Sequence, residues 1–482
     1  MPRHNARLRS TAFDATMFPM TEVAFQRCIA ASCSARYGIE EVLFSCPKCG
    51  SLLDVHYDWD RAEVPGSLAT FASRWATCGR STEARADYSG VWRFRELLPF
   101  APLEKLVTLG EGRTTLQQAD SLATTIGMKS KSLFLQYEGF NPSGSFKDNG
   151  MAAAFTVARL LGKRRVACAS TGNTSASMAL FSRHARSNDG IPLEAIVFVG
   201  GGKIAFGKLA QALDFGAKTL QIEGDFDTCM KLVRDAAQAL DLYLMNSVNP
   251  FRLEGQKTIM YRVLEGLDWQ VPDWIVVPGG NLGNTSAFGK AFVELNYLGL
   301  VDRIPRIVVV NAAGANTFCT LVNEHGLRWN DGQWDRPCVD DYQCRMNKAN
   351  YEAHTVASAI EIGRPVNLTK ALRTLDAMDG IVRQVTDNEI LDAKALVGAH
   401  GYGCEPASAA SVAGLRLLLK EKVISPSDRV VCILTGHALK DASTTVDYHC
   451  AKTSVGCFVN APIQCPTNID AIAKTLNAGD RR

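Results

Sequence analysis

The segment Asn141–Gly150 places a lysine, Lys147, between a strand-like run and a helical run. The strand-like run is Ser132–Tyr137, the helical run is Met151–Leu161, and Asn, Pro, Ser and Gly mark the turn between them. Lysines at the mouth of a strand–loop–helix unit lie where α/β proteins bind ligands, and burial there lowers their pKa. A neutral amine can form a Schiff base, although a solvated lysine in a first helical turn is the alternative interpretation.

Three further strand ends carry small polar residues or glycines. Ser170–Ser175 enters a helix with hydroxyls and an amide, which suits a carboxylate or a phenolate oxygen, although N-capping also explains it. Val276–Thr285 holds three glycines, whose backbone amides can form a nest for a phosphate; such a turn is a weak signal alone. Val430–Leu434 ends at Thr435, and the following His437 is expected to be a structural hydrogen-bonding residue.

These four features together match the needs of one cofactor. Pyridoxal 5'-phosphate requires a Schiff-base lysine, a partner for its phenolic oxygen, a phosphate cup and a group facing its ring nitrogen. The set therefore predicts a pyridoxal phosphate enzyme.

Four cysteines near the N-terminus are spaced like metal ligands. Cys28 and Cys33 have four residues between them, and Cys46 and Cys49 have two. Four thiolates on two tight turns suit tetrahedral zinc. The alternative is a metal-free relic of a zinc ribbon, in which the cysteines are small buried apolar residues.

From about residue 104 onward, predicted strands alternate with predicted helices, and these elements must position the groups named above. Continuous Val/Ile strands with intervening helices predict an α/β fold, with two open, mostly parallel sheets flanked by helices. The predicted strands are Arg165–Ala169, Ala195–Val199, Lys218–Ile222, Leu242–Met245, Trp274–Val277, Arg306–Val310 and Arg429–Leu434. The predicted helices are Asn173–His184, Asp227–Leu240, Asn284–Leu298, Asn388–His400 and Pro406–Lys420. Asn323–Glu352 is expected to be an irregular surface insertion.

The composition limits which kinds of partner and which cellular compartment are expected. The 482 residues carry a net charge of +3, which gives no reason to expect nucleic acid or a membrane surface as a partner. Fifteen cysteines, odd in number and scattered, favour a reduced, cytoplasmic compartment. Met1–Met20 carries three arginines before its first acid, which faintly resembles an organelle-targeting segment.

Seven stretches, which occur in the family's order, resemble the threonine synthases. These enzymes belong to the tryptophan-synthase-β-like superfamily, which has the type II fold of pyridoxal phosphate enzymes. The resemblance is greatest to their plant-like branch. One departure is Thr115, where that family usually has proline. The stretches are Gly110–Leu116, Ser143–Asp148, Ala169–Thr174, Asn246–Lys257, Pro278–Asn284, Ser358–Pro365 and Cys404–Ala410.

The resemblance implies a role for each matching residue. Lys147 would hold the cofactor and move protons, Asn173 would bond the phenolic oxygen, and Thr435 would face the ring nitrogen. The phosphate cup would be Gly280, Asn281, Leu282, Gly283 and Asn284. The substrate's carboxylate would meet Ser170, Thr171 and Thr174, and its phosphate Lys208, Asn246, Ser247 and Arg252. Glu405 is interpreted as a helix-capping carboxylate, with contact to the cofactor ring as the alternative.

The implied reaction converts O-phospho-L-homoserine and water to L-threonine and phosphate by γ-elimination and β-addition. Alternatives are a β-replacing or deaminating relative, such as a cysteate synthase or a serine/threonine dehydratase, and a non-catalytic binding protein. The resemblance also implies a homodimer and allows regulation by S-adenosylmethionine. The expected parts are residues 1–100, zinc-ribbon-like and packing; 101–134 plus 241–450, the large cofactor-binding domain; 135–240, the small domain; and 451–482, a tail.

Overall fold

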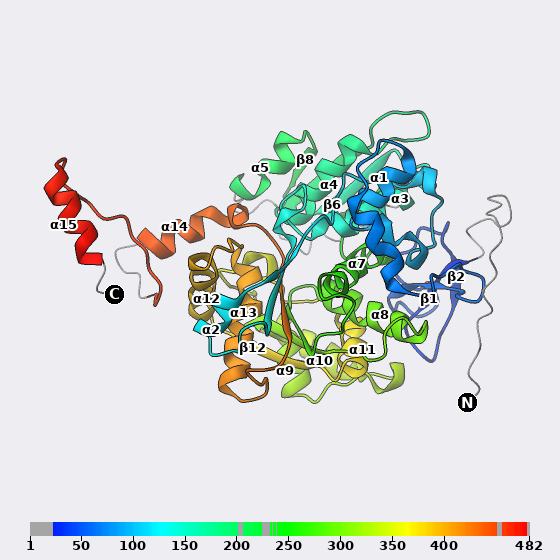
Figure 1. The fold of residues 1–482 in the computed structure, drawn as a ribbon. Helices are drawn as coiled ribbons and strands as arrows, with labels where there is room; N and C mark the ends of the chain where they lie inside the picture. Colours follow the sequence, from blue (N-terminus) through cyan, green and yellow to red (C-terminus); the bar gives the residue numbers. More distant parts are fainter. Residues whose placement is uncertain are drawn as a thin grey trace.

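The computed structural model of the chain describes residues 23–200, 206–223, 232–233, 235–237, 239–450 and 456–479, without the side chains of 206–208 and 478–479. Three sheets organise these residues (Figure 1). The segment Met1–Met20 and most of the predicted helix Asp227–Leu240 lie outside the described residues.

The larger sheet has six strands in the order β12-β11-β10-β13-β5-β4. All neighbours are parallel except β4, which runs antiparallel to β5. The bounds are β4 Leu116–Gln118, β5 Leu133–Tyr137, β10 Trp274–Pro278, β11 Arg306–Ala312, β12 Ile381–Val385 and β13 Val430–Leu434.

Helices cover both faces of this sheet, and alternate strand residues pack on opposite faces. Ile275 and Val277 lie in one core with helices α7, α8, α9 and α11, whereas Val276 lies in another with α2, α12 and α13. Burial on both faces explains the continuous apolar strands. The helices are α2 Asp120–Thr125, α7 Pro250–Gly266, α8 Gly283–Tyr297, α9 Thr317–Asn323, α11 Leu368–Ala377, α12 Asp387–Ala399 and α13 Pro406–Lys420.

The smaller sheet is wholly parallel, in the order β8-β7-β6-β9. Its strands are β6 Arg165–Ala169, β7 Glu194–Gly200, β8 Lys218–Ile222 and β9 Tyr243–Leu244, and its helices include α3 Lys147–Leu160, α4 Asn173–His184 and α5 Phe206–Asp214. The two sheets with their helices confirm the predicted fold class.

The division into domains remains a prediction, and two strands lie at its boundaries. The predicted boundary at residue 135 falls inside β5, which pairs along its whole length with β13 of the larger sheet. β9 lies just after the boundary at residue 241, yet it pairs with β6 of the smaller sheet.

The N-terminal region forms a third, antiparallel sheet, β2-β1-β3, over Ala24–Cys28, Arg36–Gly38 and Leu53–Tyr57. The short helix α1, Thr82–Tyr88, and three 3₁₀ helices connect it to the larger sheet; the 3₁₀ helices are η2 Leu68–Ala76, η3 Trp92–Leu97 and η4 Leu103–Lys105. Trp92, the first residue of η3, is fully buried, as a packing region requires.

The prediction of an irregular insertion over 323–352 is wrong. Helix α10 occupies Arg336–Lys348, and the Asp335 side chain caps it by accepting a hydrogen bond from the Cys338 N–H at 3.0 Å. Met346 is the only residue of α10 that is buried, so the helix lacks the apolar stripe from which periodicity is recognised.

The last described helices are α14, Ala442–Cys450, and α15, Ile469–Gly479. α14 contacts α12 through the hydrogen bond from the Tyr448 hydroxyl to Asp392 at 2.6 Å, whereas α15 lies away from the body of the molecule (Figure 1). Among the described residues, no helix combines the length and the apolar character needed to cross a membrane.

Candidate active site

Lys147 is the first residue of α3 and is half-buried at the carboxyl edge of the larger sheet. The turn before it is fastened to the end of β13: the Phe146 N–H donates to the Thr435 carbonyl at 2.9 Å, and the His437 N–H to the Gly144 carbonyl at 2.9 Å. Desolvation, helped by the positive charge of Arg252, lowers the pKa of Lys147 to about 7. The amine is therefore partly neutral near neutral pH.

Asp148 fixes the shape of the turn that presents Lys147. Its buried carboxylate accepts hydrogen bonds from the Ser143 N–H and hydroxyl, both at 2.6 Å, and from the Ser177 hydroxyl. Gly144, at φ +83°, supplies a left-handed turn that few other residues adopt. The polar start of α3 is thus held by tertiary contacts.

The glycine-rich loop lies between β10 and α8. Leu282 caps α8 in the left-handed conformation, at φ 60° and ψ 18°. A Cβ on Gly280 would lie 3.0 Å from Ile360 Cα, and one on Gly283 would lie 3.1 Å from Gln256 Oε1, so the loop has little room for side chains. The N–H groups that open α8 lack intrahelical acceptors, so they are available to an anion; their role as a phosphate cup stays a prediction.

Glu405 joins the predicted phenolate and ring-nitrogen partners. It accepts hydrogen bonds from Asn173 Nδ2 at 2.9 Å and from the Thr435 hydroxyl at 3.2 Å. Burial raises the pKa of Glu405, and the hydrogen bond from Asn173 opposes that effect. Glu405 occupies the N-cap position of α13 but its side chain makes no capping bond, so its interpretation as a helix cap is wrong.

Arg252 lies on α7 and is 1% exposed. Its Nη1 donates to the Met245 carbonyl at 2.9 Å, whereas its buried Nε has no hydrogen-bond partner among the described residues. Burial lowers the pKa of Arg252 to about 10, so the guanidinium is charged at neutral pH. A buried guanidinium with an unpaired N–H indicates an anionic ligand.

One pocket brings together nine of the predicted site residues. They are Lys147, Ser247, Arg252, Gly280, Asn281, Leu282, Gly283, Asn284 and Thr435. Asn173 reaches this set through Glu405, and Ser170, Thr171 and Thr174 share the junction of β6 and α4 with it. The Asn246 side chain is engaged with the Ala169 backbone, at 3.1 and 3.0 Å, so it fastens the end of β6. The side chain of Lys208 lies outside the described residues.

Sequence reasoning missed several residues at this pocket. Phe146 lies 3.7 Å, measured at its ring centroid, from Lys147 Nζ. Gln256, Ala359, Ile360 and Ala407 also line the pocket, and all four lie within stretches that carried the family resemblance. Their position within those stretches was the sequence signal that could have identified them as pocket residues. His437, by contrast, is structural as expected: its Nδ1 accepts from the Leu439 N–H at 3.1 Å.

The pocket fits pyridoxal phosphate on three observations. It presents a primary amine whose pKa is about 7, a helix N-terminus that lacks side chains at its glycines, and a hydroxyl at the end of β13. In the first turn of α8, the buried Thr285 hydroxyl has no partner among the described residues, so it can donate to an anion bound there.

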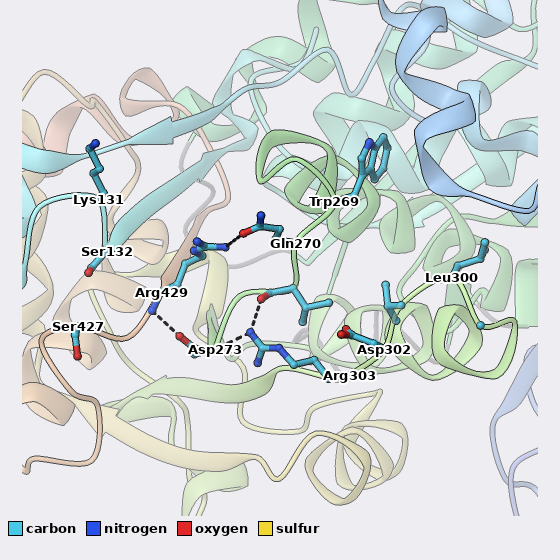
Figure 2. A pocket seen from close by; sticks show the side chains of 13 residues that line it. Lys131, Ser132, Trp269, Gln270, Asp273, Leu300, Asp302, Arg303, Ser427 and Arg429 are labelled. Atoms are coloured by element: carbon cyan, nitrogen blue, oxygen red, sulfur yellow. Dashed lines mark hydrogen bonds and ion pairs between the residues drawn. The ribbon is translucent and has the colours of Figure 1, made fainter.

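A second pocket lies at the opposite edge of the larger sheet, where β5, β10 and β13 begin (Figure 2). Its polar groups bond one another: Asp273 accepts from Arg303 at 3.1 Å and from the Arg429 N–H at 2.8 Å. Ligands of open α/β sheets bind at the carboxyl ends of the strands, so the Lys147 pocket is the candidate active site.

Comparison with known families and proteins agrees with this geometry. The model of the family described as "Pyridoxal-phosphate dependent enzyme" matches residues 107–436. Threonine synthase of Methanocaldococcus jannaschii is 40% identical over 438 residues, covering 90% of this chain and 97% of that protein. Threonine synthase of Methanosarcina acetivorans is 42% identical over 451 residues, covering 93% and 98%. Threonine synthase 2, chloroplastic, of Arabidopsis thaliana is 35% identical, covering 92% and 83%.

Solved structures share the fold at lower identity. The processed form of threonine deaminase isoform 2 from Solanum lycopersicum superposes with a TM-score of 0.55 at 16% identity, covering 77% of this chain and 94% of that one. The family match and the identities to three threonine synthases lead to one conclusion: the chain belongs to the threonine synthase family of pyridoxal phosphate dependent enzymes.

Proposed function

We propose that the chain is a pyridoxal phosphate dependent lyase that converts O-phospho-L-homoserine and water to L-threonine and phosphate. The overall reaction is a γ-elimination of phosphate followed by β-addition of water. It is a carbon–oxygen lyase reaction on a phosphate ester, and its product is L-threonine.

The position of Arg252 carries this proposal. The substrate carries a carboxylate and a phosphate of its own. Its site therefore needs positively charged groups in addition to the glycine-rich loop that is proposed to bind the cofactor's phosphate. Arg252 lines the same pocket as Lys147 and the nest, and its Nε has no partner among the described residues. A dehydratase acting on serine or threonine has no substrate phosphate to bind, so it would not need this buried guanidinium.

Each remaining group has a proposed task. The N–H groups of Gly280–Asn284 bind the cofactor's phosphate at the start of α8, where the helix dipole also favours negative charge. Asn173 donates to the phenolic oxygen, and the Thr435 hydroxyl faces the ring nitrogen. A hydroxyl leaves that nitrogen largely unprotonated, which favours elimination and replacement over transamination.

When bound, the cofactor acts as an electron sink for negative charge at the substrate carbon that carries the amine. Lys147 holds the cofactor and then moves protons at the α and β carbons. Its pKa of about 7 suits both tasks, because a group that titrates near the working pH both accepts and releases protons. Phe146 lies against the amine and shields it from bulk water.

The substrate's carboxylate is proposed to bind at the start of α4, with Ser170, Thr171 and Thr174. Lys208, Asn246 and Ser247 are proposed to complete the phosphate site with Arg252. Both of these sites follow strands of the smaller sheet, β6 and β9, whereas Lys147, the glycine-rich loop and Thr435 follow strands of the larger sheet. Closure of the smaller-sheet region on the larger one would therefore exclude water during the reaction.

Phosphate release tests this function. The purified enzyme, loaded with pyridoxal phosphate, is expected to release phosphate and form L-threonine from O-phospho-L-homoserine. It is expected to form neither pyruvate from L-serine nor 2-oxobutyrate from L-threonine at a comparable rate. Turnover of L-serine alone would overturn the proposal in favour of a dehydratase.

We further propose a homodimer in which α15 contacts the second copy. Ile469, Ile472 and Leu476 are 75%, 43% and 69% exposed and follow helical spacing, so they form an apolar stripe that no described residue covers. Light scattering is expected to give twice the chain mass, and Ile469→Glu with Leu476→Glu to weaken the dimer. Ile191→Glu, at a separate exposed position, is the matched control. A monomeric parent protein would overturn this assignment.

A cytoplasmic location and regulation by S-adenosylmethionine remain predictions from the composition and from the plant-like resemblance, respectively.

A further inference from the structure

The four N-terminal cysteines converge on one point. The Sγ atoms of Cys28, Cys33, Cys46 and Cys49 all lie within 4.8 Å of one another. Cys28 and Cys33 flank the turn after β1, and Cys46 and Cys49 lie on the turn before β3. The Cys46 N–H donates to the Ser51 carbonyl at 2.7 Å and the Gly50 N–H to the Cys46 carbonyl at 2.8 Å, so the second turn is closed by its own backbone.

The spacing fits a single tetrahedral ion. Zinc–sulfur bonds of about 2.3 Å place the sulfurs of a tetrahedron roughly 3.8 Å apart. The Cys28–Cys49 and Cys33–Cys46 sulfurs are 3.4 and 3.6 Å apart, far beyond the roughly 2.05 Å of a disulfide. The Tyr37 hydroxyl lies 3.2 Å from Cys46 Sγ, as an outer-shell partner of a thiolate would.

We propose that these four cysteines bind one Zn²⁺ ion, and that the ion anchors β3 as a brace for the helices that carry the active site. The second half of this statement rests on the proposed function, since it concerns Arg252 and the phosphate nest. Four sulfur ligands in a tetrahedron select zinc over the harder divalent cations.

β3 starts four residues after Cys49 and is buried against three helices. Asp54 pairs with Lys370 of α11 at 3.0 Å, and the Lys370 ammonium also donates to the Leu53 carbonyl at 2.7 Å. The Tyr57 hydroxyl donates to Glu254 of α7 at 2.7 Å. Lys290 of α8 donates to the Val55 carbonyl and pairs with Glu254.

The same helices hold the anion-binding groups. α7 carries Arg252 two residues before Glu254, and α8 begins at the nest and carries Lys290. β3 pairs along its whole length with β1, which ends at Cys28, and it follows Cys46 and Cys49, so the proposed ion ties the ends of both strands together. Loss of the ion therefore releases the end of β3 and loosens both helices.

The segment that leads into helix α10 borders the cysteine cluster. Trp334 packs against the cysteine cluster, and Arg336 donates to the Ser51 hydroxyl at 2.7 Å. The 323–352 insertion thereby gains a role as a cover for the zinc site.

Metal analysis of the full-length protein, purified under reducing conditions, tests the site without using substrate. We expect one equivalent of zinc per chain. After exchange, Co²⁺ is expected to give the intense thiolate-to-cobalt absorbance of a tetrahedral sulfur site. Protein with no zinc that also fails to bind Co²⁺ would overturn the site, whatever its activity.

The variant Cys46→Ser tests the bracing role, with the exposed Cys78→Ser as the matched control. Cys46→Ser is expected to lose its zinc, unfold at a lower temperature and bind pyridoxal phosphate more weakly, while Cys78→Ser keeps all three properties. Zinc-free Cys46→Ser with unchanged unfolding and cofactor affinity would overturn the brace. If Cys46→Ser fails to fold, the zinc is instead released from the parent protein with a mercurial thiol reagent, and the same two readouts decide.

Discussion

Asn173 Nδ2 donates to Glu405 Oε2 across 2.9 Å, and this hydrogen bond joins the two sheet regions of the molecule. Asn173 opens α4, which follows a strand of the smaller sheet, and Glu405 precedes α13, which packs on the larger one. Thr435 donates to the same carboxylate. Glu405 therefore sets the distance between the two proposed contacts of the cofactor ring.

The rate at which the cofactor-free protein captures pyridoxal phosphate is expected to depend on pH through Lys147. A lysine with a lowered pKa is charged below that value and neutral above it. Because the pKa of Lys147 is about 7, the rate should rise with pH through about 7 and then level off. Stopped-flow absorbance of the bound cofactor measures it. A rate that keeps rising toward pH ~10.4, the ordinary value for lysine, would contradict the lowered pKa.

Replacing Glu405 by glutamine is expected to move that profile. The negative charge of Glu405 raises the pKa of Lys147, opposing the larger effect of desolvation. Glu405→Gln removes the charge, so the midpoint of cofactor capture should shift to lower pH than in the parent protein. Glu421→Gln, at the exposed end of α13, is the control and should leave the midpoint unchanged. An unshifted midpoint in Glu405→Gln would show that the carboxylate does not act on Lys147.

Much of the fold was predictable because its strands are buried on both faces. β6, β8, α4 and α13 match their predicted bounds residue for residue. α7 was not predicted, although it spans 17 residues. It is buried nearly all round yet carries charged residues such as Arg252, Glu254 and Lys257, so no apolar stripe marks it.

The candidate site was predicted by residue type, but its connections were not. Lys147 was placed four residues before the expected start of a helix, whereas α3 begins at Lys147. The polar start of α3 is helical because Asp148 bonds back to Ser143, a tertiary contact that propensity does not contain. Glu405 was assigned a local role because the local pattern fits an N-cap, while its partners, Asn173 and Thr435, are remote in sequence.

Substitution of Arg252 is expected to weaken substrate binding rather than cofactor binding. A hydrogen bond to a charged group is worth about 1.5–3 kcal/mol, so Arg252→Ala should raise the KM for O-phospho-L-homoserine roughly 10- to 100-fold. Arg252→Lys keeps the charge but loses the planar guanidinium, so its KM should lie between those of the parent protein and Arg252→Ala. Steady-state phosphate release measures both, and Arg306→Ala, in an exposed ion pair, is the control. An unchanged KM in Arg252→Ala would remove Arg252 from the substrate site.

The brace at β3 predicts a difference between buried and exposed carboxylates. Asp54, 1% exposed, pairs with Lys370, and breaking a buried pair costs about 3–5 kcal/mol. Asp54→Asn should therefore lower the free energy of unfolding by about that amount. Asp379→Asn, in an exposed pair with Arg306, should lower it by ~0–1 kcal/mol. Urea unfolding measures both variants.

The Asp54–Lys370 pair also predicts that the free energy of unfolding falls at acid pH. Burial disfavours the Asp54 carboxylate, but the nearby Arg373 and Lys370 charges hold the pKa of Asp54 well below its ordinary 3.8. The folded state then binds fewer protons than the unfolded state below that value. The stability difference between the parent protein and Asp54→Asn should be constant down to about pH 4 and shrink below it. A constant difference throughout the acid range would contradict the pairing.

The central claim is that Lys147 holds the cofactor in a site built for a phosphorylated substrate. It is tested most directly by recording the absorbance of purified enzyme before and after addition of O-phospho-L-homoserine, with released phosphate measured in the same sample. We predict a visible cofactor band that shifts with this substrate and is accompanied by phosphate release, and the absence of both from Lys147→Ala. A band that ignores O-phospho-L-homoserine but responds to L-serine would contradict the substrate, and the full band and activity in Lys147→Ala would contradict the role of the lysine.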